Sequence, residues 1–152
     1  EFSFSKPMKG LYLHGNFGCG KTYILSACFN EMKKRGFRTK IVYLPDLLRI
    51  IKGDFEAMND IMDELCNIDI LLIDDIGAEK VTDWGRDEIL GTILQSRMNE
   101  HKTTFFTSNF TIKELEEHLS NKGVDKVKAN RIVERIKQLT IDMEMLGANM
   151  RK

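Results

Sequence analysis

The sequence contains no long hydrophobic run and little cysteine. Its longest purely aliphatic run extends from Ile70 to Ile73, whereas a membrane-spanning helix needs about 20 apolar residues. The three cysteines, Cys19, Cys28 and Cys66, have the spacing of neither a disulfide framework nor a zinc site, and the three histidines are equally scattered. We therefore expect no membrane span and no metal site at these residues, and we expect a reducing compartment, the cytoplasm.

Net charge is also absent, because the 23 basic side chains balance the 23 acidic ones. Residues 31–53 carry seven basic and two acidic side chains, and residues 54–79 carry nine acidic and no basic ones. Such segregation is typical of a surface that faces a polyanion beside an acidic surface, but solvated helix faces produce it as well. The charge pattern can therefore support a polyanion-binding function that other features indicate, but it does not establish one alone.

The chain does contain enough apolar sequence for one domain. With 152 residues, of which 42% are hydrophobic, it can bury a core and fold alone, which excludes disorder. Its first residue is Glu rather than Met, and no charged-then-apolar leader is present. We therefore expect residues 1–152 to be one domain excised from a longer protein.

Apolar patterning predicts strands that alternate with helices. The expected strands cover residues 10–14, 40–44, 68–73, 103–107 and 139–143, and Pro45 is expected to close the second one. The expected helices cover residues 21–35, 55–66 and 84–100, a segment that begins at the Thr111 capping box, and a segment that carries Ala129, Ile132, Val133 and Ile136 on one face. This alternation with short connections predicts the α/β class, a parallel sheet with helices on both faces.

A glycine-rich segment lies between the first predicted strand and the first predicted helix. It fits the Walker A pattern and consists of Gly15, Asn16, Phe17, Gly18, Cys19, Gly20, Lys21 and Thr22. Its glycines allow main-chain N–H groups to surround a phosphate at a helix N-terminus. In this pattern Lys21 reaches the β- and γ-phosphates of ATP, and the Thr22 hydroxyl binds Mg²⁺. The alternative is an ordinary glycine-rich turn, and the lysine and threonine argue against it.

Two further predicted strands end in polar residues. The aliphatic strand that ends at Ile73 is followed by Asp74 and Asp75, which is the Walker B form. We expect Asp74 to hold Mg²⁺, and Asp75 to orient and deprotonate the attacking water. Asn109 follows the next predicted strand and is expected at the same crevice, where its amide positions the water. Taken alone, the two acids also fit a strand that ends in solvated side chains, and Asn109 fits turn chemistry before a helix.

Four segments in this order, GNFGCGKT, ILLIDDIG, TTFFTSN and ANRIVERIK, resemble the AAA+ ATPase domain of the bacterial replicative-helicase loaders of the DnaI and DnaC type. The resemblance spans the whole chain. It implies a P-loop NTPase with an AAA+ core of five parallel strands flanked by helices, as the C-terminal part of a longer protein. It also implies ATP or ADP bound by residues 15–22, and Asn109 as sensor 1.

In this family an arginine of one subunit completes the ATP site of its neighbour. The match to ANRIVERIK implies Arg135 for this role, with Arg131 close by. Lys128, Arg131 and Arg135 also share one helix face opposite the apolar stripe, where a subunit partner could meet them. An ordinary solvated basic face is the alternative.

Two departures from the family limit what the resemblance implies. Most AAA+ proteins have glutamate as the second Walker B acid, where this sequence has Asp75, so vigorous turnover is in doubt. Only ten residues follow Asp142, too few for the helical lid that supplies a second sensor arginine. The lid is therefore expected to be reduced or absent, and Arg151 is a remote candidate for that sensor.

The resemblance implies an ATP-hydrolysing loader that places the replicative hexameric DNA helicase on single-stranded DNA, in primosome assembly at replication initiation or restart. It also implies self-association through the arginine finger and slow hydrolysis by a lone subunit. Single-stranded DNA is expected at the basic block Lys33–Lys52, where Phe37 and Tyr43 are candidates for stacking, although Tyr43 also fits a packed strand residue. The alternatives are another AAA+ DNA accessory ATPase, either an IstB-like transposition helper or an origin initiator, and a nucleotide-dependent scaffold without turnover.

Overall fold

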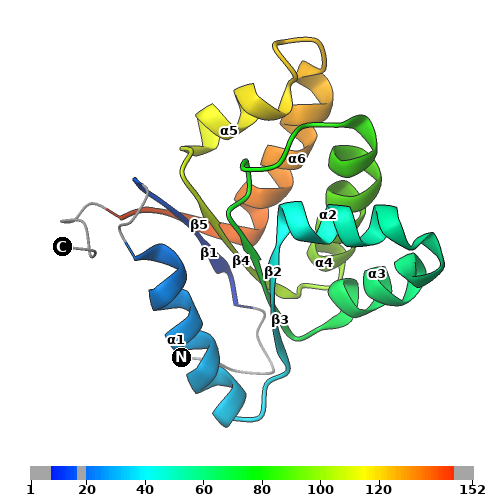
Figure 1. The fold of residues 1–152 in the computed structure, drawn as a ribbon. Coiled ribbons are helices and arrows are strands. Elements are labelled where there is room, and N and C mark those ends of the chain that lie inside the picture. The colour runs from blue at the N-terminus through cyan, green and yellow to red at the C-terminus, as the bar shows by residue number, and fades with distance from the viewer. Residues whose placement is uncertain (1–7, 17–19, 146–152) are drawn as a thin grey trace.

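The computed structural model describes residues 8–16 and 20–145. A five-stranded parallel sheet forms its centre, with the strands in the order β2-β3-β4-β1-β5. The strands are β1 (Gly10–His14), β2 (Thr39–Tyr43), β3 (Ile70–Asp74), β4 (Thr103–Ser108) and β5 (Thr140–Glu144). Because β4 lies between β1 and β3, the residues that follow these three strands meet at one edge of the sheet (Figure 1). The predicted α/β class with five parallel strands is confirmed.

Helices cover both faces of the sheet. α1 (Lys21–Lys34) lies on one face (Figure 1). On the other face lie α2 (Leu44–Gly53), α3 (Met58–Asn67), α4 (Gly91–Asn99), α5 (Ile112–Leu119) and α6 (Lys126–Leu139). A 3₁₀ helix, η1 (Phe55–Ala57), precedes α3, and a π-helix, η2 (Trp84–Leu90), precedes α4. Within the described residues, no helix combines the length and apolar character that crossing a bilayer requires.

The β3 strand is covered on both sides. Ile70, Leu71, Leu72 and Ile73 are each at most 1% exposed. Alternate side chains point to opposite faces of a strand, so Ile70 and Leu72 pack beneath α1 while Leu71 and Ile73 pack beneath the other helices. Each such side chain contributes about 1.5–3 kcal/mol through its burial. A continuous aliphatic strand is the sequence signature of this arrangement, and it gives Asp74 a well-packed base.

The predicted second strand is present as β2, but Pro45 does not close it, and α2 was missed. In the structure β2 ends at Tyr43, and α2 begins at Leu44 with Pro45 in its first turn. Proline is tolerated there because the first N–H groups of a helix have no intrahelical acceptor. Leu44, Leu47 and Ile51 are buried at helical spacing. That spacing is a signal in the sequence that predicts the helix.

The remaining predicted elements are present with shifted ends. The helix predicted over 84–100 consists of η2 followed by α4, and the helix predicted over 55–66 consists of η1 followed by α3. The capping box is observed, because the Thr111 hydroxyl accepts the Glu114 N–H at 3.1 Å and the Glu114 carboxylate accepts the Thr111 N–H at 2.8 Å. The predicted apolar stripe of α6 is buried as expected.

Candidate nucleotide-binding site

The segment predicted as Walker A connects β1 to the start of α1. Gly15 and Asn16 follow β1 directly, and Gly20 is the N-cap of α1 with a φ of 92°. That left-handed backbone favours glycine, which has no Cβ to clash. Outside the described residues lie Phe17, Gly18 and Cys19. The N-terminus of a 14-residue helix therefore faces this turn, and its N–H groups favour an anion there.

The Lys21 side chain is buried at the carboxyl ends of β1 and β4. Its Nζ donates to the Gly15 carbonyl at 3.0 Å, to the Asn16 carbonyl at 3.2 Å and to Asn109 Oδ1 at 3.1 Å. Lys21 and Asn109 are far apart in the sequence, and the strand order brings them together. The ammonium and the amide are therefore close enough to act on the same ligand.

Thr22 and Asp74 also lie in contact. The Thr22 hydroxyl donates to Asp74 Oδ1 at 2.9 Å, and the Thr107 hydroxyl donates to the same oxygen at 2.6 Å. A hydroxyl and a carboxylate at this distance are the hard oxygen donors that Mg²⁺ prefers. The hydrogen bond from Thr107 orients the Asp74 carboxylate, as supporting residues commonly do at metal sites.

Asp75 follows Asp74 with a left-handed backbone, φ 58°. Its N–H donates to the Thr107 hydroxyl at 2.8 Å, so Thr107 contacts both acids. Burial and the neighbouring charge of Asp74 raise the pKa of the Asp75 carboxyl, and the Lys21 ammonium lowers it in part. A half-buried carboxylate with a raised pKa is a better proton acceptor than an ordinary aspartate.

Arg135 lies on α6 and faces α4 rather than the cluster of Lys21 and Asp74. An added Cβ at Gly91 would lie 3.6 Å from Arg135 Nη1, so the guanidinium passes directly over this glycine. Arg135 borders a polar groove of about 620 Å³, which we call the α4 groove and which Asp87 also lines. Lys128 Nζ lies 3.6 Å from Asp87, on the same side of α6. Arg135 is thus presented at a surface, away from its own chain's candidate site.

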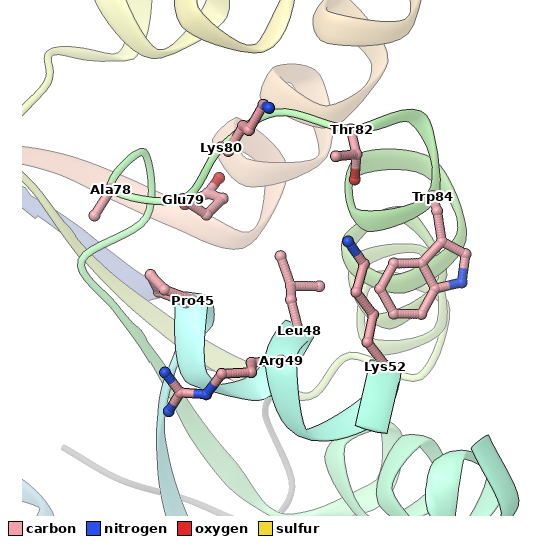
Figure 2. Close-up of a pocket in the computed structure, with 9 residues that line it drawn as sticks. All are labelled: Pro45, Leu48, Arg49, Lys52, Ala78, Glu79, Lys80, Thr82 and Trp84. Atoms are coloured by element: carbon pink, nitrogen blue, oxygen red, sulfur yellow. The ribbon is translucent and has the colours of Figure 1, made fainter. Parts of the chain in front are cut away.

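A second groove lies between α2 and the segment that joins β3 to η2. This α2 groove has a volume of about 360 Å³ and is lined by Leu48, Arg49, Lys52, Glu79, Lys80 and Trp84, among others. Figure 2 shows Lys52 of α2 extending alongside the Trp84 ring, and its Nζ lies 5.7 Å from the ring centroid. Phe55, 62% exposed, packs edge-on against Trp84. Exposed basic and aromatic side chains therefore meet at this surface.

The stacking residues proposed from the sequence require correction. Phe37 is only 8% exposed and packs in the core beneath α1, so it cannot stack on a base. Tyr43 is 42% exposed at the end of the edge strand β2. Phe55 and Trp84 are isolated in the sequence, and only the fold brings their rings together. Arg151, the remote candidate for a second sensor, lies outside the described residues.

Comparison with known proteins identifies the family. The AFG1-like ATPase family model matches residues 3–147. The chain belongs to this family of AAA+ ATPases. It is 41% identical over 148 residues to the replicative helicase loader DnaI of Bacillus subtilis, a match that covers 94% of this chain and 48% of the relative. The identity with the replicative helicase loader DnaC of Buchnera aphidicola subsp. Baizongia pistaciae is 28%, covering 83% of this chain and 53% of the relative.

A crystal structure of DnaI superposes with a TM-score of 0.88 at 48% identity, over 99% of this chain and 77% of that one. The resemblance stated from the sequence is therefore confirmed: the AFG1-like ATPase domain described here is homologous to replicative helicase loaders of the DnaI and DnaC type. The chain spans about half the length of the curated relatives it matches. The family implies nucleotide binding.

Proposed function

We propose that this chain binds ATP together with Mg²⁺ and hydrolyses it at the cluster of Lys21, Thr22, Asp74, Asp75 and Asn109. The observation that carries the proposal is a pair of hydrogen bonds joining three separate motifs, one between Lys21 and Asn109 and one between Thr22 and Asp74. In this assignment the main-chain N–H groups of the glycine-rich segment and the Lys21 ammonium bind the phosphates.

Thr22 and Asp74 are the residues that would hold Mg²⁺. The ion, when bound, neutralises charge on the phosphate oxygens that it contacts. Asp74 Oδ1 already accepts hydrogen bonds from two hydroxyl groups, those of Thr22 and Thr107. These contacts hold the carboxylate in one orientation, which lowers the cost of organising it around a cation.

Asp75 is assigned as the base that orients and deprotonates the attacking water, and Asn109 as the residue that positions this water. The raised pKa of Asp75 supports the first role, because a stronger base accepts a proton more readily. The aspartate side chain is one methylene shorter than glutamate and reaches less far. We therefore assign slow turnover to this site.

Arg135 is assigned as an arginine finger that acts on the site of a neighbouring copy. It lies at the α4 groove, away from the cluster of its own chain, so it can serve an ATP site only in another subunit. Such arginines contribute about 10³ to 10⁵ in rate. Hydrolysis should therefore depend on self-association.

The biological role we propose is loading of the replicative hexameric helicase on DNA during primosome assembly, in the cytoplasm, at replication initiation or restart. The support is homology to proteins named replicative helicase loaders. Because the matched relatives are about twice as long as this chain, contact with the helicase stays a proposal for the whole protein. Co-sedimentation with the host's hexameric helicase, with and without ATP, tests it.

An ATP-dependent shift of the protein into the helicase fraction is the expected result. Failure to co-sediment under both conditions, combined with capture of a transposase or of duplex origin DNA, would instead favour a transposition helper or an origin initiator. A nucleotide-dependent scaffold is a different alternative. Single-turnover ATP hydrolysis at high protein concentration separates it from an enzyme, because a scaffold gives no phosphate release that Asp75→Asn can abolish.

Single-stranded DNA is proposed as a ligand of the α2 groove. Arg49, Lys52 and Lys80 supply positive charge for phosphates, and Trp84 with Phe55 supplies faces for base stacking. Stacking on one aromatic side chain is worth about 1–3 kcal/mol per base. Phe37 is buried, so the α2 groove replaces it as the candidate surface for single-stranded DNA. Lys52 belongs to the predicted basic block and also lines this groove.

The matched pair Lys52→Ala and Lys33→Ala tests this location. Both residues belong to the predicted basic block, but Lys33 lies in the last turn of α1, and only Lys52 lines the groove. We expect Lys52→Ala to weaken binding of a fluorescent oligothymidylate and to reduce its salt dependence by about 0.7 in the log–log slope. Lys33→Ala should match the wild type. Equal losses in both variants would place the DNA elsewhere.

A further inference from the structure

The segment that follows β3 is packed against the segment that follows β4. The Ile76 N–H donates to the Thr107 carbonyl at 2.9 Å, and the Ser108 hydroxyl donates to the Ile76 carbonyl at 2.6 Å. Gly77 has a φ of 101°, and a Cβ there would lie 2.6 Å from the Phe110 ring. The backbone at Gly77 therefore packs closely against the Phe110 ring.

Phe110 also contacts the helix that follows it. Its ring lies 5.3 Å from the His118 ring of α5, centroid to centroid, and its carbonyl accepts the buried Tyr12 hydroxyl at 2.7 Å. His118 Nε2 in turn lies 3.1 Å from the Glu79 carbonyl. Since a carbonyl can only accept, Nε2 is the protonated nitrogen in this contact. Phe110 and His118 thus connect Asn109, the residue before Phe110, to Glu79.

Glu79 is a wall residue of the α2 groove. It is 8% exposed, and its carboxylate accepts the Gly77 N–H at 2.8 Å. Both its backbone and its side chain are therefore held by the residues around Phe110. Its neighbours Ala78 and Lys80 line the same groove, so a displacement of Glu79 changes the position of the Lys80 ammonium.

The other end of these contacts is the Lys21 ammonium. Among the described residues, the Lys21 ammonium donates to the Gly15 and Asn16 carbonyls and to Asn109 Oδ1. A phosphate oxygen that binds Lys21 must compete with these acceptors. Asn109 is the side chain among the three and is joined directly to Phe110. It can change its partner by rotation, whereas the two carbonyls belong to the loop backbone. Asn109 therefore has two alternative states, one hydrogen-bonded to Lys21 and one released from it when a phosphate binds Lys21.

We propose that Phe110 and His118 couple nucleotide binding at Lys21 to single-stranded DNA binding in the α2 groove, with His118 as a positioning residue that contacts neither ligand. This inference rests on the proposed function, since it takes both ligands from it. Coupling of this kind is reciprocal: whatever factor the nucleotide imposes on DNA affinity, DNA imposes on nucleotide affinity.

The test is the ratio of two dissociation constants for a fluorescent oligothymidylate, measured with and without a non-hydrolysable ATP analogue and Mg²⁺. For the wild-type protein we expect a ratio of about 5 to 150. His118→Leu keeps the approximate volume but removes the N–H donor and should bring the ratio to within about twofold of one. Each ligand alone should still bind with its wild-type affinity. Phe110→Leu, which removes the ring between Gly77 and His118, should act in the same way.

Two controls separate coupling from a general structural effect. His118→Gln keeps an N–H donor and should retain most of the wild-type ratio. Lys113→Ala, on the exposed side of α5, should retain all of it. A purely structural role for His118 would instead change melting temperature or single-ligand affinities and leave the ratio intact.

The outcomes distinguish the inference from the proposed function. If both ligands bind but the wild-type ratio is one, or if His118→Leu and Phe110→Leu keep the wild-type ratio, the coupling is wrong and the ligand assignments stand. If the wild-type protein binds no analogue, or binds no oligothymidylate, the proposed function itself fails. A ratio lost in both leucine variants and kept in His118→Gln supports the inference.

Discussion

Lys21 is the residue on which nucleotide binding depends most directly. In the described part of the chain its ammonium donates to the neutral oxygens of Gly15, Asn16 and Asn109, and phosphate offers it charged acceptors instead. Hydrogen bonds to charged groups contribute about 1.5–3 kcal/mol each, which is about 10- to 150-fold in affinity. We expect Lys21→Ala to weaken ATP binding by at least about 10-fold, measured by titration calorimetry. Lys34→Ala, in the last turn of the same helix, is the matched control, and an unchanged dissociation constant for Lys21→Ala would refute the assignment.

Asp75 makes a second prediction, which concerns pH. Burial and the charge of Asp74 raise the pKa of its carboxyl in the folded chain. The folded state then binds this proton more tightly than the unfolded state, so ionised Asp75 lowers the free energy of unfolding near neutral pH. That destabilisation disappears as the pH falls below the unfolded pKa of about 4.

We therefore expect Asp75→Asn to raise the melting temperature at about pH 7 and to give no such increase at about pH 3, because the wild-type carboxyl is protonated there. Thermal unfolding followed by circular dichroism measures both. Asp63→Asn, an exposed change on α3, controls for the loss of one negative charge. A variant that is no more stable than wild type near neutrality would show that burial and the Asp74 charge do not raise the pKa of Asp75 in the folded chain.

At the scale of elements, Arg97 joins α3, α4 and β4. It is 0% exposed, and Nη1 donates to the Leu65 and Ile68 carbonyls at 2.9 and 2.8 Å, at the end of α3. Nη2 donates to the Thr103 carbonyl and Nε to the Thr104 hydroxyl, both at 2.8 Å. Burial lowers the pKa of Arg97 to about 10, so it stays charged at neutral pH. Removing the guanidinium would take this donor away from all four acceptors.

Arg97→Met should therefore lower the free energy of unfolding by at least about 2 kcal/mol, because buried carbonyls lose their partners. Urea denaturation measures the change. Arg35→Met is the control, since the exposed Arg35 forms a 3.9 Å surface pair with Glu31, worth about 0–1 kcal/mol. Similar losses in the two variants would mean that the hydrogen bonds of Arg97 contribute little.

These elements also show how far the sequence predicts the structure. The β3 strand and the Walker A segment were predictable because double-sided burial requires an aliphatic run and because the glycine-rich loop combines residue type with spacing. α2 was missed because a proline fits both a strand end and a first helical turn. The buried position of Arg97 could not be predicted, because its acceptors lie at the end of α3 and on β4, and only the fold places both beside α4.

In the candidate site, too, some features were predictable from the sequence and others depend on tertiary packing. Lys21, Asp74 and Asn109 were predictable because each follows a predicted strand, and parallel strands end at one edge of the sheet. The α2 groove was not predictable, since Lys52, Trp84 and Glu79 belong to a helix, a π-helix and a loop that only tertiary packing places together. Patterns along a chain report local burial, whereas a groove depends on which elements become neighbours.

At the scale of the whole molecule, Arg135, the proposed arginine finger, lies far from the candidate ATP site of its own chain. Arg135 lies over Gly91 at the α4 groove, while Lys21 lies at the carboxyl ends of β1 and β4. If a neighbour's arginine completes each site, two different defects can compensate for each other. Lys21→Ala removes a site but keeps the finger, and Arg135→Ala removes the finger but keeps the site.

We therefore expect each variant alone to hydrolyse ATP far more slowly than wild type, and an equimolar mixture to exceed both, because Lys21→Ala subunits supply fingers to the intact sites of Arg135→Ala subunits. Steady-state phosphate release at high protein concentration measures this, and dilution should abolish the gain. The control uses Arg131→Ala in place of Arg135→Ala, because Arg131 is an exposed residue on the same helix. A mixture no faster than the mean of its components would mean that Arg135 does not act across subunits.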